Sequence, residues 1–213
     1  MAHKGLWEQL DKLDPKLTAQ RAKCRYITEQ GRYVIRLLNK EYVVDPGERQ
    51  IFSAGPKLGQ KKAGFIEQLC LLAYLINARD LPLADKLVKP EALPSGQFFF
   101  RGLHSLPTKK LEKGFGRCPE RLYRIAGRFD AEKCEFGDAS IRLYLLPRIP
   151  LTVVIWRSDD EFGARASILF DQTVAEQIPL DALLAAVNLA VDAIAAACEE
   201  TDCSTVRRPA DCQ

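Results

Sequence analysis

The C-terminal third of the chain carries the pattern that most constrains the fold. Three runs of strand-forming residues, "ASIRLYLL", "LTVVIW" and "RASILFD", follow one another between residues 139 and 171. In the first run, apolar Ile141, Leu143 and Leu145 alternate with more polar residues, the two-residue period of a strand with one wet face. The second run is apolar on both faces, as in a central strand. The pattern predicts a three-stranded antiparallel set.

Long apolar helices are predicted to cover these strands. In "IPLDALLAAVNLAVDAIAAAC", residues 178–198, the larger apolar residues fall on one helical face: Leu180, Leu183, Leu184, Val187, Val191 and Ile194. The many alanines of this segment favour helix and permit close packing. The segment "FIEQLCLLAYLINA", residues 65–78, is apolar on nearly every face, which indicates a helix buried against a sheet. Two shorter helices are expected at roughly 106–114 and 119–128.

The N-terminal quarter predicts a helix followed by a second set of strands. Leucines 6, 10, 13 and 17 form one helical stripe, with a break at Asp14-Pro15. Four short β-branched and aromatic runs between residues 24 and 54 are separated by turn signals, and they predict a four-stranded antiparallel meander. The glycine- and lysine-rich segment 55–64 is expected to be a surface loop.

These elements together predict one α+β domain over residues 1–200. Its 47% hydrophobic content is enough for one sizeable core. We expect a mostly antiparallel sheet, formed by the N-terminal meander and the C-terminal three-stranded set, packed against the hydrophobic helices. Residues 201–213 are expected to form a flexible tail.

The composition limits where the protein works and what it binds. The charged N-terminus does not resemble a secretory signal, and we expect no apolar run to approach the roughly 20 residues that span a bilayer. We therefore expect a cytoplasmic protein with reduced thiols and no membrane partner. Lys and Arg number 31 against 28 Asp and Glu, a net charge of +3, which does not favour nucleic acid as a partner.

No recognisable motif assigns a catalytic residue or a cofactor. The nucleophile elbow, phosphate loop, dinucleotide fingerprint and zinc-protease helix are all missing from the sequence. The histidines are His3 and His104, so acid–base chemistry would depend on His104 in "FRGLHSLP". One alternative is therefore an enzyme for a small anionic substrate, with Arg101 as the anion anchor and His104 as acid or base.

The seven cysteines contain no CxxC pair, the spacing from which most zinc and iron–sulfur sites are built. Cys70 and Cys198 fall within apolar helical segments, which favours buried structural thiols. Cys198, Cys203 and Cys212 form a C-x4-C-x8-C cluster. A cysteine-ligated metal-cluster protein is therefore the second alternative.

Residues 101–128 hold eight cations and two acidic residues, and Arg121, Arg124 and Arg128 share one helical face. This face is either the polar side of an amphipathic helix or a binding surface for an acidic protein or a small anion. Nucleic acid is not expected, because base-stacking aromatics are not interleaved with the cations. Trp156 and the aromatic residues at 98–100 either line a ligand pocket or belong to the core.

The stretch "RSDDEFG" places Asp159, Asp160 and Glu161 between two predicted strands. A connection of this length lies at the surface, where acidic residues remain solvated. A calcium loop would need oxygen ligands at alternating positions, whereas these three residues are consecutive. The sequence therefore predicts the exposed tip of a hairpin.

The order of several segments resembles the uncharacterised domain-of-unknown-function family 3786. The similar segments include "LDKLDPKLTAQRAKCRYITEQGRYVIRLLNKEYVVD", "QLCLLAYLINA", "FRG" and "FGDASIRLYLLPRIPLTVVIWRSDDEFGARASILFD". The resemblance implies an occurrence mostly in anaerobic bacteria and archaea, where some members are fused to a four-cysteine iron–sulfur domain like that of corrinoid proteins. This chain lacks that close-spaced cysteine motif. The resemblance implies a non-catalytic binding or accessory role near metallocofactor or one-carbon metabolism, and it transfers no catalytic residue.

Overall fold

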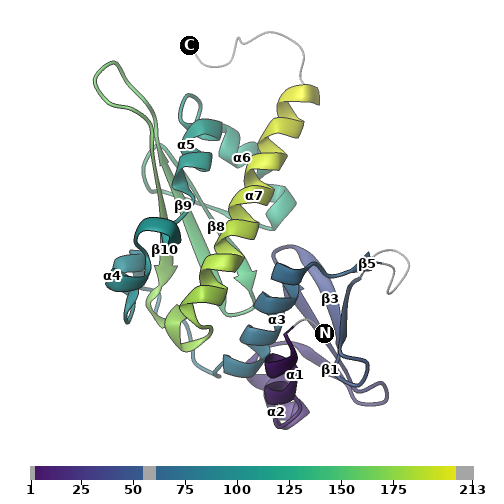
Figure 1. Ribbon diagram of the computed structural model, residues 1–213. Coiled ribbons are helices and arrows are strands. Elements are labelled where there is room, and N and C mark those ends of the chain that lie inside the picture. Colours follow the sequence, from purple (N-terminus) through teal and green to yellow (C-terminus); the bar gives the residue numbers. More distant parts are fainter. Residues whose placement is uncertain (1–2, 55–60, 205–213) are drawn as a thin grey trace.

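The computed structural model describes residues 3–54 and 61–204, with side chains as far as Thr201, and this part of the chain has an α+β fold (Figure 1). The predicted fold class is confirmed, with one correction. Within the described residues the two strand-rich regions form separate five-stranded antiparallel sheets instead of one. Each region satisfies its ladder hydrogen bonds through its own hairpins, so neither needs strands from the other.

The first sheet has the strand order β1-β2-β3-β4-β5. Its strands are β1 (Arg25–Ile27), β2 (Arg32–Leu37), β3 (Lys40–Asp45), β4 (Gln50–Ser53) and β5 (Lys61–Lys62). The predicted four-stranded meander is confirmed. The segment expected as a loop contributes the short β5, which pairs with β4; residues 55–60 of that segment lie outside the described residues.

The second sheet has the order β6-β10-β9-β8-β7. Its strands are β6 (Leu87–Val88), β7 (Glu132–Cys134), β8 (Ala139–Leu146), β9 (Ile149–Trp156) and β10 (Arg165–Asp171). The predicted three-stranded set is confirmed, with the doubly apolar β9 at its centre. The edge strands β6 and β7 were not predicted, because two or three residues are too few to show a period.

The α-helices are α1 (Lys4–Leu10), α2 (Pro15–Arg21), α3 (Phe65–Asn77), α4 (Gly96–Phe99), α5 (Thr108–Phe115), α6 (Arg121–Ile125) and α7 (Leu180–Ser204). Short 3-10 turns are η1 (Pro90–Ala92), η2 (Gly102–His104), η3 (Ala126–Phe129) and η4 (Gln172–Glu176). The predicted break at Asp14 is confirmed, since its carboxylate accepts the Leu17 N–H at the start of α2. Residues 201–204, expected in the tail, continue α7, and residues 205–213 lie outside the described residues.

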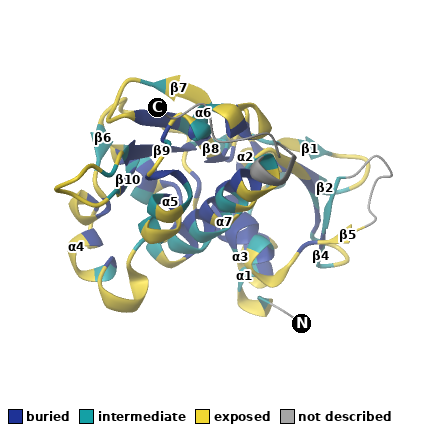
Figure 2. Ribbon diagram, turned by 90° about the horizontal axis from the view of Figure 1, so that it is seen from above, coloured by how far each residue is buried: buried dark blue, intermediate teal, exposed yellow. Residues whose placement is uncertain are grey.

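Helices α3 and α7 join the two sheets into one hydrophobic cluster. In Figure 1, α7 lies across one face of the second sheet with α5 and α6 beside it, while α3 packs on the first sheet and α1 packs against α3. Figure 2 shows that the buried residues lie on the central strands and helices, while the loops around them are exposed. The Cys70 Sγ lies 3.7 Å from the Ala182 carbonyl oxygen, which marks the contact between α3 and α7.

Helix α7 corrects the expectation that no apolar segment approaches the length of a membrane span. Over Leu180–Thr201 it has 22 residues and is, by length and composition alone, the one described helix that could cross a membrane. In the structure its apolar stripe, with Leu183, Val187 and Ile194 fully buried, packs into the core. The helix therefore occupies the position of a central core helix.

Candidate functional site

A cleft of about 760 Å³ lies where the first sheet meets the end of the second. Its walls come from the end of α2, from β1, β2 and β3, from the end of η3 and from the β8–β9 turn. Apolar side chains form much of the lining, including Ala19, Val34, Leu38, Phe129 and Leu146. The size and the apolar lining are typical of small-molecule sites, which commonly measure about 300–1,000 Å³.

The backbone of Leu38 fixes the distance between the two walls. The Leu38 N–H donates to the Leu145 carbonyl oxygen of β8 at 2.8 Å, a hydrogen bond between the two sheets. Leu38 has φ of +54°, in the left-handed region that bulky side chains rarely adopt. Such backbone strain persists where the surrounding structure imposes it, and it clusters at functional sites.

Charged side chains surround the apolar interior of the cleft. Arg25 pairs with Glu41 at 3.0 Å, and Arg36 pairs with Asp130. Lys23 lines the same cleft and is exposed, and within the described part of the chain it forms no ion pair. Because the other four charges neutralise one another in pairs, the cleft is left with one uncompensated positive charge.

Cys24 is the half-buried thiol of the cleft. Burial raises its pKa to about 12, so the thiol is protonated at neutral pH. A protonated thiol is neither an effective nucleophile nor a ready metal ligand. Among residues 3–54 and 61–201, no group of three His, Cys, Asp or Glu side chains is placed to hold a metal ion. The described lining thus combines an apolar surface, a protonated thiol and a charged rim.

Arg101 and His104 do not line this cleft. Both are exposed at η2, where the His104 ring stacks on Phe99 with ring centroids 4.7 Å apart and planes inclined by 12°. Within the described residues the His104 ring makes no hydrogen bond that would orient it as an acid or base. The structure places both residues on an exposed surface.

The predicted arginine face lies against α7. Arg121 donates to the carbonyl oxygens of Gly114 at 3.3 Å and Cys198 at 3.4 Å. Arg128 pairs with Glu200 at 2.6 Å, and Arg124 is exposed. Arg121 and Arg128 thus connect α6 and the turn after it to the C-terminal half of α7, and they stabilise this helix contact.

Two of the described cysteines, Cys70 and Cys198, follow the structural interpretation. Cys70 and Cys198 are buried, and burial raises the pKa of Cys70 to about 12. Cys118 is disulfide-bonded, which corrects the expectation that every thiol stays reduced. The side chain of Cys203 and all of Cys212 lie outside the described residues, so the C-x4-C-x8-C cluster stays a prediction.

Trp156 is half-buried at the end of β9 and does not open onto the cleft. The Arg165 guanidinium lies 4.6 Å from the centroid of its ring. On another side Gly137, at φ +59°, approaches so closely that a Cβ there would lie 3.3 Å from the ring. Trp156 is thus packed against Arg165 and Gly137 and remains partly exposed.

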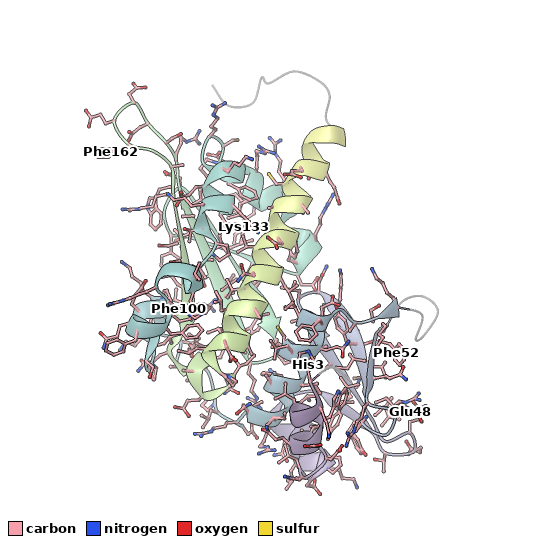
Figure 3. The ribbon with its side chains drawn as sticks, in the orientation of Figure 1. His3, Glu48, Phe52, Phe100, Lys133 and Phe162 are labelled. Carbon is pink, nitrogen blue, oxygen red and sulfur yellow. The ribbon has the colours of Figure 1, made fainter. Side chains whose placement is uncertain are left out.

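Asp159, Asp160 and Glu161 form the exposed tip of the β9–β10 hairpin, as predicted. The Asp159 carboxylate accepts the N–H groups of Glu161 and Phe162, and this turn orders the tip. In Figure 3, Phe162 lies at the end of this protruding hairpin.

Replacement of Asp159, Asp160 and Glu161 by Asn, Asn and Gln is expected to change the free energy of unfolding by no more than about 0.5 kcal/mol. The side chains are exposed, and Asn at 159 keeps an oxygen that can accept the turn hydrogen bonds. Urea denaturation of both proteins would measure the difference. A loss several times larger would show that these three side chains contribute to the stability of the fold.

The cleft residues were not predicted from the sequence. Lys23, Cys24, Arg36, Asp130 and Tyr144 come from distant segments, and each has an ordinary local context. The one local signal was the group of basic residues around Cys24 in "RAKCRY", which the spacing of the cysteines does not reveal.

Comparison with known protein families identifies one match. The family described as Domain of unknown function (DUF3786) matches residues 14–193. This span covers both sheets and most of α7, so the chain belongs to that family. Searches among curated proteins and among solved structures found no match.

Proposed function

We propose that this member of the family is a non-catalytic binding protein whose ligand is a small anion with a mainly apolar body. The observation that carries this proposal is the 760 Å³ cleft between the two sheets, with its apolar lining and its charged rim. Clefts at the junction of two structural units are frequent ligand sites, and a few polar groups in them set the orientation of the ligand.

The chemistry of the ligand follows from the side chains of the cleft. Val34, Leu38 and Phe129 favour a body without polar groups, because burying an unpaired polar group costs free energy. Lys23 supplies the uncompensated cation and favours one anionic group. The protonated Cys24 argues for binding and against covalent chemistry.

We further propose a cytoplasmic, accessory role beside metallocofactor or one-carbon metabolism. The resemblance to a family with iron–sulfur-fused members supports this setting. The described side chains contain no three-residue metal-ligating group. An accessory role, in which another protein holds the metallocofactor, is therefore the form of the proposal that fits this chain.

The fluorescent probe 8-anilinonaphthalene-1-sulfonate tests the cleft, because it is an apolar body with one anionic group. We expect saturable binding at one site on the native protein. Lys23→Glu should weaken this binding by about tenfold or more, since it replaces an attraction by a repulsion, equivalent to at least about 1.4 kcal/mol. Tyr144→Ala, which shortens a side chain lining the cleft, should weaken it as well.

Lys16→Glu is the matched control, because Lys16 is an exposed lysine on α2, shortly before Lys23 in the chain, but does not line the cleft. It should bind the probe as the unchanged protein does. Equal loss in Lys16→Glu and Lys23→Glu would indicate a general charge effect. Probe binding that survives both Lys23→Glu and Tyr144→Ala would place the site elsewhere and refute the proposal.

A further inference from the structure

Among the described residues, the three most exposed large apolar side chains lie on two separate surfaces. The first surface, the acidic tip, consists of Asp160, Glu161 and Phe162 at the end of the β9–β10 hairpin. Phe162 is 69% exposed, and in the described part of the chain neither acidic side chain has an ion-pair partner. The tip therefore presents an apolar ring beside two uncompensated negative charges.

The second surface, the basic knob, consists of Lys89, Phe98, Arg101 and Leu103. Phe98 is 72% exposed and Leu103 is fully exposed. With Phe162 they are the three most exposed of the large apolar side chains that the structure describes. Exposed apolar groups that gather on one segment, with charges around them, are typical of interaction surfaces.

The knob is rigid, so its apolar side chains are held outward by the fold. Gly96 approaches the Pro90 carbonyl oxygen so closely that a Cβ there would lie 2.0 Å from it. Phe100 is buried and anchors the knob in the core. The His104 ring stacks on Phe99, which links the residue after Phe98 to the residue after Leu103. A segment built in this way does not need to become ordered on binding, which lowers the entropic cost of association.

A groove of about 390 Å³ lies between the knob and the edge of β10. Phe100, Leu106 and Ile168 are among its apolar lining, with the hydroxyl groups of Ser105 and Thr108 beside them. Strand β6 pairs only with Phe170 and Asp171, so no described strand covers the rest of this edge of β10. The groove can hold one aromatic side chain.

The charges around the groove are mainly positive. Lys89 lines it and Arg101 lies on the adjoining knob, and neither forms an ion pair with a described residue. Glu91 is the acidic residue of the lining. Lys109, nearby on α5, is neutralised by Glu112 at 2.7 Å. The surface thus attracts a segment that carries negative charge and an aromatic anchor.

We propose that the acidic tip of one copy of this chain docks into the groove beside the basic knob of a second copy. Phe162 enters the groove, while Asp160 and Glu161 face Lys89 and Arg101. The tip cannot reach its own groove, because the rigid β9–β10 hairpin holds it away from the knob, and Figure 3 shows Phe162 and Phe100 well apart on this side of the molecule. The contact joins two different surfaces, so it generates head-to-tail assemblies.

Sedimentation velocity over a concentration series, with two charge-reversal variants, tests this contact. The tip variant is Asp160→Lys with Glu161→Lys, which leaves the Asp159 turn intact. The knob variant is Lys89→Glu with Arg101→Glu. The unchanged protein should form oligomers larger than a dimer as its concentration rises, and each variant alone should associate at least about tenfold more weakly.

The decisive sample is an equimolar mixture of the two variants. The tip variant keeps a working knob and the knob variant keeps a working tip, and the reversed tip and the reversed knob also carry opposite charges, so mixing should restore the assembly that each variant alone has lost. High salt should dissociate it, because exposed charges are screened. Phe162→Ser should also weaken assembly of the otherwise unchanged protein.

The matched control reverses two exposed glutamates on the first sheet's turns, Glu29→Lys with Glu48→Lys. It should assemble like the unchanged protein. An unchanged protein that stays monomeric at every concentration would overturn the proposal. A mixture of the two variants that remains monomeric would overturn it too, as would unimpaired assembly of either variant alone.

Discussion

Leu183→Ala is expected to lower the free energy of unfolding by about 3 kcal/mol. Leu183 is 0% exposed on α7, next to Ala182, whose carbonyl oxygen contacts Cys70 of α3. The substitution removes apolar contacts and leaves a cavity in the core against which α7 packs, a site that cannot collapse without moving a helix. Guanidinium denaturation followed by circular dichroism would measure the loss.

Leu184→Ala is the matched control, because Leu184 is the neighbouring leucine on the same helix but is only half-buried. We expect it to cost clearly less than Leu183→Ala. Equal costs for the two substitutions would mean that α7 is not packed with Leu183 facing the core.

Asp171→Ala is expected to lower the free energy of unfolding by about 2 kcal/mol. Asp171 is 3% exposed at the end of β10. One carboxylate oxygen accepts the Ala84 N–H at 3.1 Å, the Thr173 N–H at 3.0 Å and the Thr173 hydroxyl at 2.6 Å. Alanine leaves these donors without their acceptor. The loop before β6 thereby loses its attachment to β10.

The lowered pKa of the same carboxylate makes the stability of the fold depend on pH. Burial by itself raises the pKa of Asp171, but the hydrogen bonds from Thr173 and from the backbone of Ala84 and Asp85 outweigh it and hold the pKa below the ordinary 3.8. The ionised group therefore stabilises the fold fully above pH values near 3.8, and this contribution is lost as the pH falls through the lower folded-state pKa.

Asp171→Asn removes this titration while keeping an acceptor oxygen. Unfolding free energies measured from neutral pH down to acid should show the unchanged protein losing stability more steeply below about pH 4, so that the difference between the two proteins shrinks there. A difference that stays constant over this range would show that Asp171 does not have a lowered pKa.

The fold class and the main elements could be predicted because their signals are local. β8 alternates, β9 is apolar on both faces, and α7 carries a stripe that repeats at helical spacing. Pro15 after Asp14 located the start of α2. The expectation that no apolar segment approaches the length of a membrane span was wrong for α7, because its alanines and scattered polar residues obscured a continuous apolar helix of 22 residues.

The edge strands and the separation of the sheets could not be predicted. β6 has two residues and β7 has three, and each becomes a strand only because a longer neighbour offers it free hydrogen-bonding groups. Whether two sets of strands share one sheet depends on which edges meet in space. Periodicity along the chain carries no information on that choice.

Of the candidate sites, too, only some features could be predicted from the sequence. The acidic tip was found in the sequence, since consecutive charges between two strands define an exposed hairpin end. The anion-binding hypothesis for Arg121 and Arg128 lacked the information that both contact α7. Spacing along a helix shows which side chains share a face, but not what that face packs against.

The sequence by itself determined the α+β class, the two sets of antiparallel strands, the central helices and the exposed acidic hairpin, because hydrophobic periodicity and turn chemistry act over a few neighbouring residues. Only the tertiary structure decided that the strands form two sheets and that Lys23, Leu38 and Asp130 line one cleft. It also set the groove beside the basic knob. These features depend on contacts between residues far apart in the chain, which are fixed when the separate apolar faces are buried together in one core.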